Sequence, residues 1–381
     1  MRIPFNKPFI VGKELDYIAQ AVRTHGHLSG DGVFTKRCQA WLEKRLGCKK
    51  ALLTHSCTGA LEMAAILCDI KPGDEVIMPS FTFVTTANAF VLRGGVPVFV
   101  DIRKDTFNIN ESLLRNAITP RTKAIVAMHY GGVSCNMNEI MRIAEEHNLF
   151  VIEDAAQALL SLYQGRNLGT IGHLGCLSFH ETKNVISGEG GALLINDISM
   201  LERAEIIREK GTNRSRFFRG EVDKYTWVDI GSSYLPSELV GAFLYAQLEQ
   251  ADTIIAKRKY LFSLYFDLIK PLEQRGVISL PLINETSSGN GHLFCILAKN
   301  LRERDSLIDY LEKDQIKSVF HYVPLHSSPA GRKNGRFIGS MTVTDDVSER
   351  LIRLPLYYEL NEADISRVVK SIEAFFTPSD L

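Results

Sequence analysis

Short apolar runs alternate with amphipathic segments through the first half of the chain. The apolar runs fall at residues 50–54, 74–80, 96–102, 123–130 and 149–154. Each run leads into a segment whose apolar positions repeat at helical spacing. Buried strands separated by helical segments predict βαβ units, and hence a mostly parallel sheet with helices on both faces.

The pattern changes after residue 170. Two further apolar runs, 174–179 and 191–197, have no helical segment between them, so one of these strands is free to run antiparallel. Residues 236–270 then keep helical spacing long enough for one long helix or a helix pair, and 284–291 is the expected flexible loop. We therefore expect an α/β protein with a large domain and a smaller C-terminal α/β domain. Their expected bounds are 1–250 and 251–381.

Composition narrows the function classes. The chain of 381 residues carries 44 basic and 44 acidic side chains, so no overall field attracts nucleic acid or an anionic membrane. No apolar run approaches the roughly 20 residues of a membrane span, and the N-terminus has no signal-peptide core. The 7 cysteines are scattered without a C-x-x-C pair. We expect a cytoplasmic protein without disulfides, a zinc site, nucleic-acid binding or membrane insertion.

In open α/β sheets, ligands bind at the carboxyl ends of the parallel strands. The first run leads into "SCTGALEMA", where small hydroxyl residues open a helix. Free N–H groups and the helix dipole favour a phosphate there, although Ser56 or Thr58 could simply cap the helix. The second run delivers Phe81 and Phe83. A strand-end aromatic is usually a core residue, and the alternative is stacking on a flat heterocycle.

The remaining strand ends deliver charged groups. Glu153 and Asp154 follow four apolar residues, and a buried carboxylate there needs a partner. Asp154 either caps the next segment or pairs with a cationic ring nitrogen, with Gln157 one turn further on. Lys183 stands alone in a polar, glycine-rich elbow between two strands. A phosphate cradle, an aromatic, a carboxylate and an amine in this order indicate a pyridoxal 5′-phosphate (PLP) site, where the lysine forms a Schiff base.

Longer stretches carry a family resemblance. "VIEDAAQA", "GCLSFHETKNVISGEGGALLIND" and "SCTGALEMA" resemble the PLP-dependent sugar aminotransferases of the DegT/DnrJ/EryC1/StrS family over nearly the whole chain. The resemblance implies the PLP-dependent transferase fold of type I, with a mostly parallel seven-stranded sheet in the large domain. "GDEVIMPSFTFVTTANAFVLRGG" and "REKGTNRSRFFRGEVDKYTW" are most similar to members that aminate dTDP-4-dehydro-6-deoxy-D-glucose at C4.

The resemblance assigns roles to individual residues. It implies that Lys183 is the Schiff-base lysine and catalytic residue, that Asp154 pairs with the pyridine nitrogen and that Phe83 stacks on the ring. Lysine rather than histidine at position 183 favours amino transfer over the dehydration seen in one branch of the family. The cofactor-binding residues that it implies are Cys57, Thr58, Phe83, Asp154, Gln157, Ser178 and Ser233.

Ser233 marks a departure from the family pattern. Many members carry an Asn within G-x-N-x-[RK] that reaches the phosphate in the partner subunit of a homodimer. Here the stretch reads Gly231-Ser232-Ser233-Tyr234-Leu235, so Ser233 replaces the Asn and the basic residue is lost. The resemblance still implies a homodimer with shared active sites.

The substrates that the resemblance implies are L-glutamate and a dTDP-4-keto-6-deoxyhexose. Candidate sugar-nucleotide contacts are Arg214, in the loop-like stretch 211–220, and His321, Tyr322 and His326. Arginine matches phosphate oxygens, although a solvated loop is an equal interpretation of 211–220. Pro324 breaks regular spacing between the two histidines, which argues against a metal site.

Two rival functions stay open on sequence alone. "GTIGHLG" loosely evokes the glycine loop of a nicotinamide enzyme, but it neither follows the first strand nor opens a helix. A non-enzymatic PLP-binding sensor is the second rival, made less favourable by the intact Lys183. Among transaminases, the resemblance favours the galacto over the gluco 4-amino product.

Overall fold

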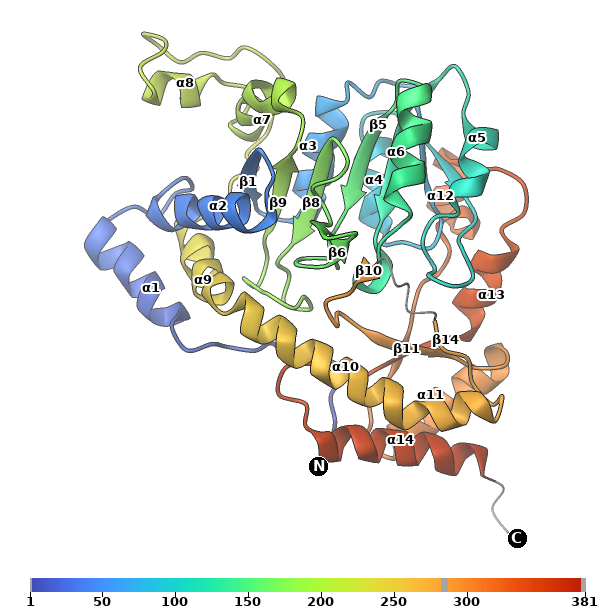
Figure 1. Cartoon of the computed structure of the whole chain (residues 1–381). Helices are drawn as coiled ribbons and strands as arrows, with labels where there is room; N and C mark the ends of the chain where they lie inside the picture. The colour runs from blue at the N-terminus through green and yellow to red at the C-terminus, as the bar shows by residue number, and fades with distance from the viewer. Residues whose placement is uncertain (1, 282–286, 378–381) are drawn as a thin grey trace.

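A computed structural model of the protein describes residues 2–281 and 287–377 (Figure 1). Its centre is an eight-stranded sheet with helices on both faces. In spatial order the strands are β1 (Lys50–Thr54), β9 (Gly191–Ile195), β8 (Leu174–Ser178), β5 (Phe150–Asp154), β4 (Thr122–Met128), β2 (Glu75–Pro79), β3 (Val96–Val100) and β13 (Arg336–Phe337).

The strand pattern confirms the expected mostly parallel sheet. β8, β5, β4, β2, β3 and β13 pair in parallel, whereas β9 pairs antiparallel with both β1 and β8. The expected reversal between the two consecutive strands therefore occurs at β9. Seven of the strands lie before residue 200, and β13 adds an eighth from the C-terminal region. That strand has two residues and no apolar run, so the hydrophobic pattern gave no sign of it.

The central strands are apolar throughout because both faces of the sheet are buried. Along β2, Ile77 belongs to one core and Val76 to the other, and Val151 and Ile152 alternate likewise along β5. The helices of this part are α1 (Glu14–Gln20), α2 (Val33–Leu46), α3 (Cys57–Leu67), α4 (Val84–Val91), α5 (Leu114–Ala117), α6 (Met137–Glu146), α7 (Leu201–Arg208), α8 (Arg214–Phe218) and α9 (Glu238–Glu249).

The C-terminal part has its own antiparallel sheet and core. Its sheet runs β11 (Phe294–Leu297), β14 (Leu351–Leu354), β12 (Val319–Phe320). Its helices are α10 (Ala251–Gln274), α11 (Leu301–Lys313), α12 (Pro329–Asn334), α13 (Thr342–Arg350) and α14 (Glu362–Phe376). The expected helical stretch is a pair, since α9 ends at Glu249 and α10 begins at Ala251. The division of the chain into domains at residue 250 stays a prediction.

Two short strands cross back to the large part. β10 (Ser287–Ser288) pairs with β6 (Leu162–Tyr163), which also pairs with β7 (Arg166–Asn167). Of the expected flexible loop 284–291, residues 284–286 lie outside the described residues, and Ser287 and Ser288 form β10. The C-terminal part is thus joined to the large part by β10 and β13.

Glu75 holds β13 against the sheet. Its carboxylate, 1% exposed, receives Arg336 Nη2 at 2.8 Å, Arg121 Nη2 at 2.7 Å and the Thr119 hydroxyl at 2.8 Å. Burial alone would raise the pKa of Glu75, but the bonds from Arg336, Thr119 and Arg121 outweigh it and lower that pKa to about 2. The ionised carboxylate is therefore the favoured form.

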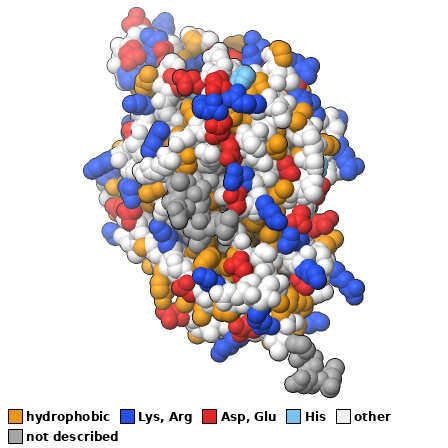
Figure 2. Space-filling view, turned by 45° about the vertical axis from the view of Figure 1, so that its right-hand side comes forward, with side chains coloured by type: hydrophobic (Ala, Val, Ile, Leu, Met, Phe, Trp, Pro, Cys, Tyr) orange, Lys and Arg blue, Asp and Glu red, His pale blue; other side chains and the backbone are white. Residues whose placement is uncertain are grey.

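The surface shows no dominant charge on the face in Figure 2, where acidic and basic side chains are interspersed. Within residues 2–281 and 287–377, every helix is too short or too polar to cross a bilayer.

Candidate active site

A cavity of about 660 Å³ opens at the carboxyl ends of β1, β5 and β8, between the two parts of the chain. It gathers most of the residues singled out from the sequence, although they lie far apart along the chain. Those that line it are Cys57, Thr58, Phe83, Asp154, Gln157, Ser178, Lys183, His321 and Tyr322.

The start of α3 forms one wall. Ser56 caps this helix by accepting the Gly59 N–H at 3.1 Å, so the capping expected from the sequence occurs. Helix geometry leaves the N–H groups of Cys57 and Thr58 without intrahelical acceptors. Capping and anion binding are therefore compatible here. A Cβ at Gly191 would lie 2.4 Å from Cys57 N, so only glycine lets β9 pass this close.

Asp154 ends β5 inside the cavity, and protein donors orient its carboxylate. Thr86 donates its hydroxyl to Oδ2 at 2.7 Å, and the Ala156 N–H reaches Oδ1 at 3.2 Å. The side chain is buried, and residues 155–160 form turns rather than a helix, so Asp154 is not a helix cap. Its carboxylate is fixed in a position where a ring cation would be a favourable neighbour.

Lys183 lies in the elbow after β8, in a turn closed by its own N–H to the His180 carbonyl at 2.9 Å. Burial lowers the pKa of Lys183 below its usual value; Cys57 and Asp154 oppose this effect, and Arg353 adds to it. A lowered pKa increases the fraction of neutral amine, which is the nucleophilic form. The lone amine of the sequence is therefore not an ordinary surface lysine.

The two candidate aromatic residues, Phe81 and Phe83, differ in their exposure to solvent. Phe81 is fully buried and packs against Tyr130 and Tyr322, with ring centroids 5.1 and 5.4 Å away. Phe83 is 56% exposed and lines the cavity at the start of α4. Phe81 is the core residue, and Phe83 is free to lie over a planar ligand.

The C-terminal part contributes a polar wall. Gln157 accepts the Gly131 N–H at 2.7 Å and donates to the Tyr322 hydroxyl at 3.0 Å, which links β5 to this wall. The His321 ring stacks on Tyr322 at 3.6 Å between centroids. Burial, aided by the charge of Arg353, lowers the pKa of His321 to about 2. His321 is therefore a neutral ring at the cavity wall.

Three of the candidates lie elsewhere. His326 bonds to the Ser80 hydroxyl at 2.8 Å through Nδ1 and faces Asp345 at 3.4 Å through Nε2, away from the cavity lining. Ser233 and Arg214 line a second cavity of about 780 Å³. Within one chain, these residues do not meet the Lys183 site.

Sequence reasoning missed several residues of the site. Thr86 lies in a helix whose sequence shows no sign of a binding site. Arg353 and His292 belong to small strands or loops of the C-terminal part. The N-terminal Phe5 and Asn6 also line the cavity. None of these positions carries a local motif, because folding alone brings them to the strand ends.

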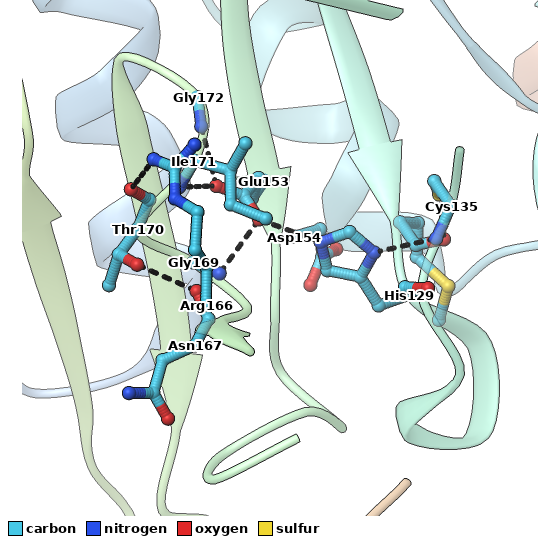
Figure 3. A network of polar contacts seen from close by, with 12 residues as sticks. His129, Cys135, Glu153, Asp154, Arg166, Asn167, Gly169, Thr170, Ile171 and Gly172 are labelled. Atoms are coloured by element: carbon cyan, nitrogen blue, oxygen red, sulfur yellow. Dashed lines mark hydrogen bonds and ion pairs between the residues drawn. The ribbon is translucent and has the colours of Figure 1, made fainter. Parts of the chain in front are cut away.

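Glu153, next to Asp154, points into a separate, fully buried network (Figure 3). Its carboxylate receives the N–H groups of Gly169, Ile171 and Gly172 at 2.6–2.7 Å and His129 Nε2 at 2.9 Å. Burial alone would raise the pKa of Glu153, but these bonds lower it.

The same network accounts for the loop "GTIGHLG". Its N–H groups do form an anion-binding loop, but the anion is the chain's own Glu153 (Figure 3). The nicotinamide interpretation of this loop is therefore excluded. No group of three or more His, Cys, Asp or Glu side chains suited to a metal gathers within the described ranges.

A lysine, a strand-end carboxylate and a free helix N-terminus at the edge of a mostly parallel sheet fit PLP, because they supply an amine for its aldehyde, an anion for its ring nitrogen and N–H groups for its phosphate. The comparisons agree with this class of enzyme. The model of the DegT/DnrJ/EryC1/StrS aminotransferase family matches residues 10–373, and the chain belongs to that family. It is an aminotransferase with PLP as its cofactor and the type I fold.

Individual relatives match over almost their full length. GDP-perosamine synthase of Caulobacter vibrioides is 32% identical, with 98% of each chain covered. The structure of Helicobacter pylori PseC, an aminotransferase involved in the biosynthesis of pseudoaminic acid, superposes with a TM-score of 0.90 at 25% identity, covering 99% of both chains. Streptococcus pneumoniae Spr1654 in its PLP form also gives 0.90 at 25% identity, covering 99% of this chain and 100% of its own.

Proposed function

We propose that this aminotransferase moves the amino group of L-glutamate to C4 of dTDP-4-dehydro-6-deoxy-D-glucose. The product is dTDP-4-amino-4,6-dideoxy-D-galactose, a precursor of cell-surface glycan such as enterobacterial common antigen or O-antigen. The observation that carries the proposal is the meeting of Lys183 and Asp154 in one cavity. The long stretches similar to 4-aminotransferases of the WecE (RffA) type support the choice of substrate, and sugar aminotransferases among the similar structures support a sugar as the amino acceptor.

The residues that would hold the cofactor follow from the cavity. The N–H groups of Cys57 and Thr58 and the Ser178 hydroxyl would hold its phosphate at the positive end of α3. Phe83 would stack on the ring, and Asp154 would favour a proton on the ring nitrogen. When bound, PLP supplies an aldehyde carbon that accepts amines and a ring that takes up electrons from the substrate.

Lys183 has two tasks in this proposal. Its amine, whose pKa burial lowers, would hold the aldehyde carbon of the cofactor covalently and would be freed when L-glutamate takes its place. The freed Nζ would take the proton from Cα of glutamate and deliver it to the former aldehyde carbon of the cofactor, two bonds away across the nitrogen, which is general acid–base catalysis with a single group. Tyr322 and the neutral His321 line the same cavity and would contact the sugar substrate.

A homodimer completes the proposal. Large apolar side chains stay exposed on α8 and the segment that follows it, which project from the large part (Figure 1). They are Phe218 at 69%, Tyr225 at 54%, Trp227 at 77%, Val228 at 50% and Ile230 at 41%. A projecting apolar segment of this kind favours a partner surface. We infer that the partner subunit covers it and that Ser233 and Arg214 serve the partner's site.

The experiment is NMR of the product formed from dTDP-4-keto-6-deoxyglucose and L-glutamate. An axial amine at C4 is the expected result. An equatorial amine would assign the gluco product. If the dTDP sugar gives no amino sugar but a sugar carrying a different nucleotide does, the substrate is another nucleotide sugar. Loss of the yellow chromophore on adding glutamate distinguishes a transaminase from a PLP-binding sensor. We place the enzyme in the cytoplasm, consistent with its free cysteines.

A further inference from the structure

Arg353 is a cation in the cavity without an acidic partner among the described residues. It lies on β14, lines the cavity and holds its guanidinium 4.6 Å from the Phe5 ring centroid. Its Nη1 donates to His321 Nε2 at 2.8 Å. Throughout the described part of the chain, no carboxylate forms an ion pair with it.

One edge of this guanidinium is left open. Nε has no hydrogen-bond partner although protein covers it, and Nη2 makes no hydrogen bond to any described residue. Nε–H and the adjacent Nη2–H point in the same direction, and this edge matches the two oxygens of a carboxylate. A buried donor without an acceptor is unfavourable, so a ligand that accepts a hydrogen bond there supplies the partner that the protein lacks.

The neighbours of Arg353 cannot serve as its anion. Since a guanidinium only donates, His321 Nε2 accepts, and the ring hydrogen sits on Nδ1 facing the Tyr130 hydroxyl at 3.2 Å. Arg258, also buried, bonds to the carbonyls of Gly291, His292 and Leu356 and to no carboxylate among the described residues, and it adds a second positive charge nearby. This wall of the cavity is therefore positive.

The acidic residues that line the cavity have other positions. Asp154 is fixed by Thr86 and Ala156, and Glu189, at the open side, faces His180 at 3.7 Å. Arg353 also contributes to the lowered pKa of Lys183, as expected for two cations sharing one cavity. An anion brought by a substrate would relieve both effects.

We propose that Arg353 binds the α-carboxylate of the amino donor through its Nε/Nη2 edge. This inference rests on the proposed function, because it supplies the donor subsite of that reaction. The α-carboxylate is one bond from the carbon that Lys183 deprotonates, so an anion site in the same cavity suits it. The diphosphate of a nucleotide sugar lies across the hexose ring from C4 and has to be held further from Lys183. Full pairing with Nε requires a small movement, since protein covers that atom.

The test separates the two half-reactions and adds a binding measurement. Arg353→Gln and Arg353→Lys are compared with Arg302→Gln, an exposed arginine on α11 without a side-chain hydrogen bond or ion pair to described residues. Calorimetry measures glutarate, an unreactive dicarboxylate, binding to the cofactor-loaded enzyme. Single-turnover bleaching by L-glutamate and recovery of the chromophore with the 4-keto sugar measure each half-reaction.

For Arg353→Gln we expect the glutarate Kd, and the glutamate concentration for half-maximal bleaching, to rise about 10- to 100-fold, as for a lost charged hydrogen-bond pair. The limiting bleaching rate and the concentration dependence with the 4-keto sugar should change less than about threefold. Arg353→Lys should recover part of the loss, and Arg302→Gln should match the wild type.

Other outcomes contradict the inference. Unchanged glutarate binding in Arg353→Gln overturns it, as does a shift confined to the sugar half-reaction, which would assign the guanidinium to the diphosphate. If the wild type binds glutarate through Arg353 but L-glutamate never bleaches it, the proposed amino donor is wrong while the carboxylate site stands.

Discussion

Thr86 donates its hydroxyl hydrogen to Asp154 Oδ2 at 2.7 Å, and both side chains are buried. Because the ionised carboxylate accepts only, the Thr86 oxygen is left to accept the hydroxyl of Thr82 at 2.8 Å. The hydrogens thus run in one direction, from Thr82 through Thr86 to Asp154. Two residues of the α4 region set the orientation of the carboxylate that meets the cofactor ring.

Replacing Thr86 by Val keeps the shape of the side chain and removes the donor. A hydrogen bond to a charged group contributes about 1.5–3 kcal/mol, so we expect cofactor affinity to fall about tenfold or more. The pH at which the bound chromophore changes colour should also shift, because the carboxylate keeps only the Ala156 N–H as a donor. Fluorescence titration with PLP and a spectrophotometric pH titration measure the two effects.

Thr86→Ser is the matched control, since it restores the hydroxyl without the methyl group. It should return both cofactor affinity and the colour-change pH toward the wild type. Val and Ser variants with the same affinity and the same pH profile would show that the hydroxyl has only a packing role.

Lys183→Ala should abolish amino transfer, because no other lysine lines the cavity among the described residues. The variant should still bind PLP without a covalent bond, through the start of α3 and Asp154. Lys183→Arg, which keeps a positive charge but forms no imine under these conditions, should be equally inactive. Turnover at the wild-type rate by either variant would remove this lysine from the mechanism.

Glu75 makes stability depend on pH in the acid range. Its pKa is lowered from 4.5 to about 2 in the folded protein, so its ion pairs stabilise the fold fully above pH 4.5. This stabilisation, roughly 3 kcal/mol at most, is lost as the pH falls from 4.5 toward 2. Glu75→Gln should be less stable than the wild type at neutral pH, with the difference shrinking as the pH approaches 2.

Urea unfolding at several pH values measures this effect. Glu145→Gln, a change at an exposed glutamate without an ion pair to any described residue, serves as the control and should leave the pH profile unaltered. A constant difference between Glu75→Gln and the wild type at every pH would show that the carboxylate charge is irrelevant.

The exposed Trp227 tests the dimer. Trp227→Ser should weaken self-association and reduce amino transfer in proportion, since a partner subunit is expected to cover this side chain, which is 77% exposed in one chain. Light scattering across a dilution series gives the mass. Leu301→Ser, at a 41% exposed position on α11, is the control. A wild type that stays monomeric at high concentration would contradict the dimer.

Much of the large part could be predicted because its strands and helices obey simple periods. The parallel strands are apolar on both faces. Asp154 lies at the carboxyl end of one of them, in the same cavity as the start of α3, the helix that follows β1. β13 and β10 could not be predicted, because each strand has only two residues. A strand this short leaves no hydrophobic pattern in the sequence.

Some residues of the site could likewise be predicted from the sequence, and others could not. Lys183, Asp154 and Phe83 could be found because strand ends and a glycine-rich elbow mark them, and the cavity brings them together. Arg353 and Thr86 could not, since their partners lie 32 and 68 residues away in sequence and only the folded chain joins them. Sequence reasoning placed Glu153 beside Asp154 but gave no sign that it faces a different network.

The central claim is that Lys183 forms the covalent bond to the cofactor aldehyde. Borohydride reduction of the yellow enzyme, followed by digestion and peptide mass spectrometry, tests it directly. The account predicts a stable pyridoxyl phosphate adduct on the peptide that contains Lys183, and on no other lysine. An adduct at a different lysine, or an enzyme that takes up PLP and yields no adduct, would contradict it.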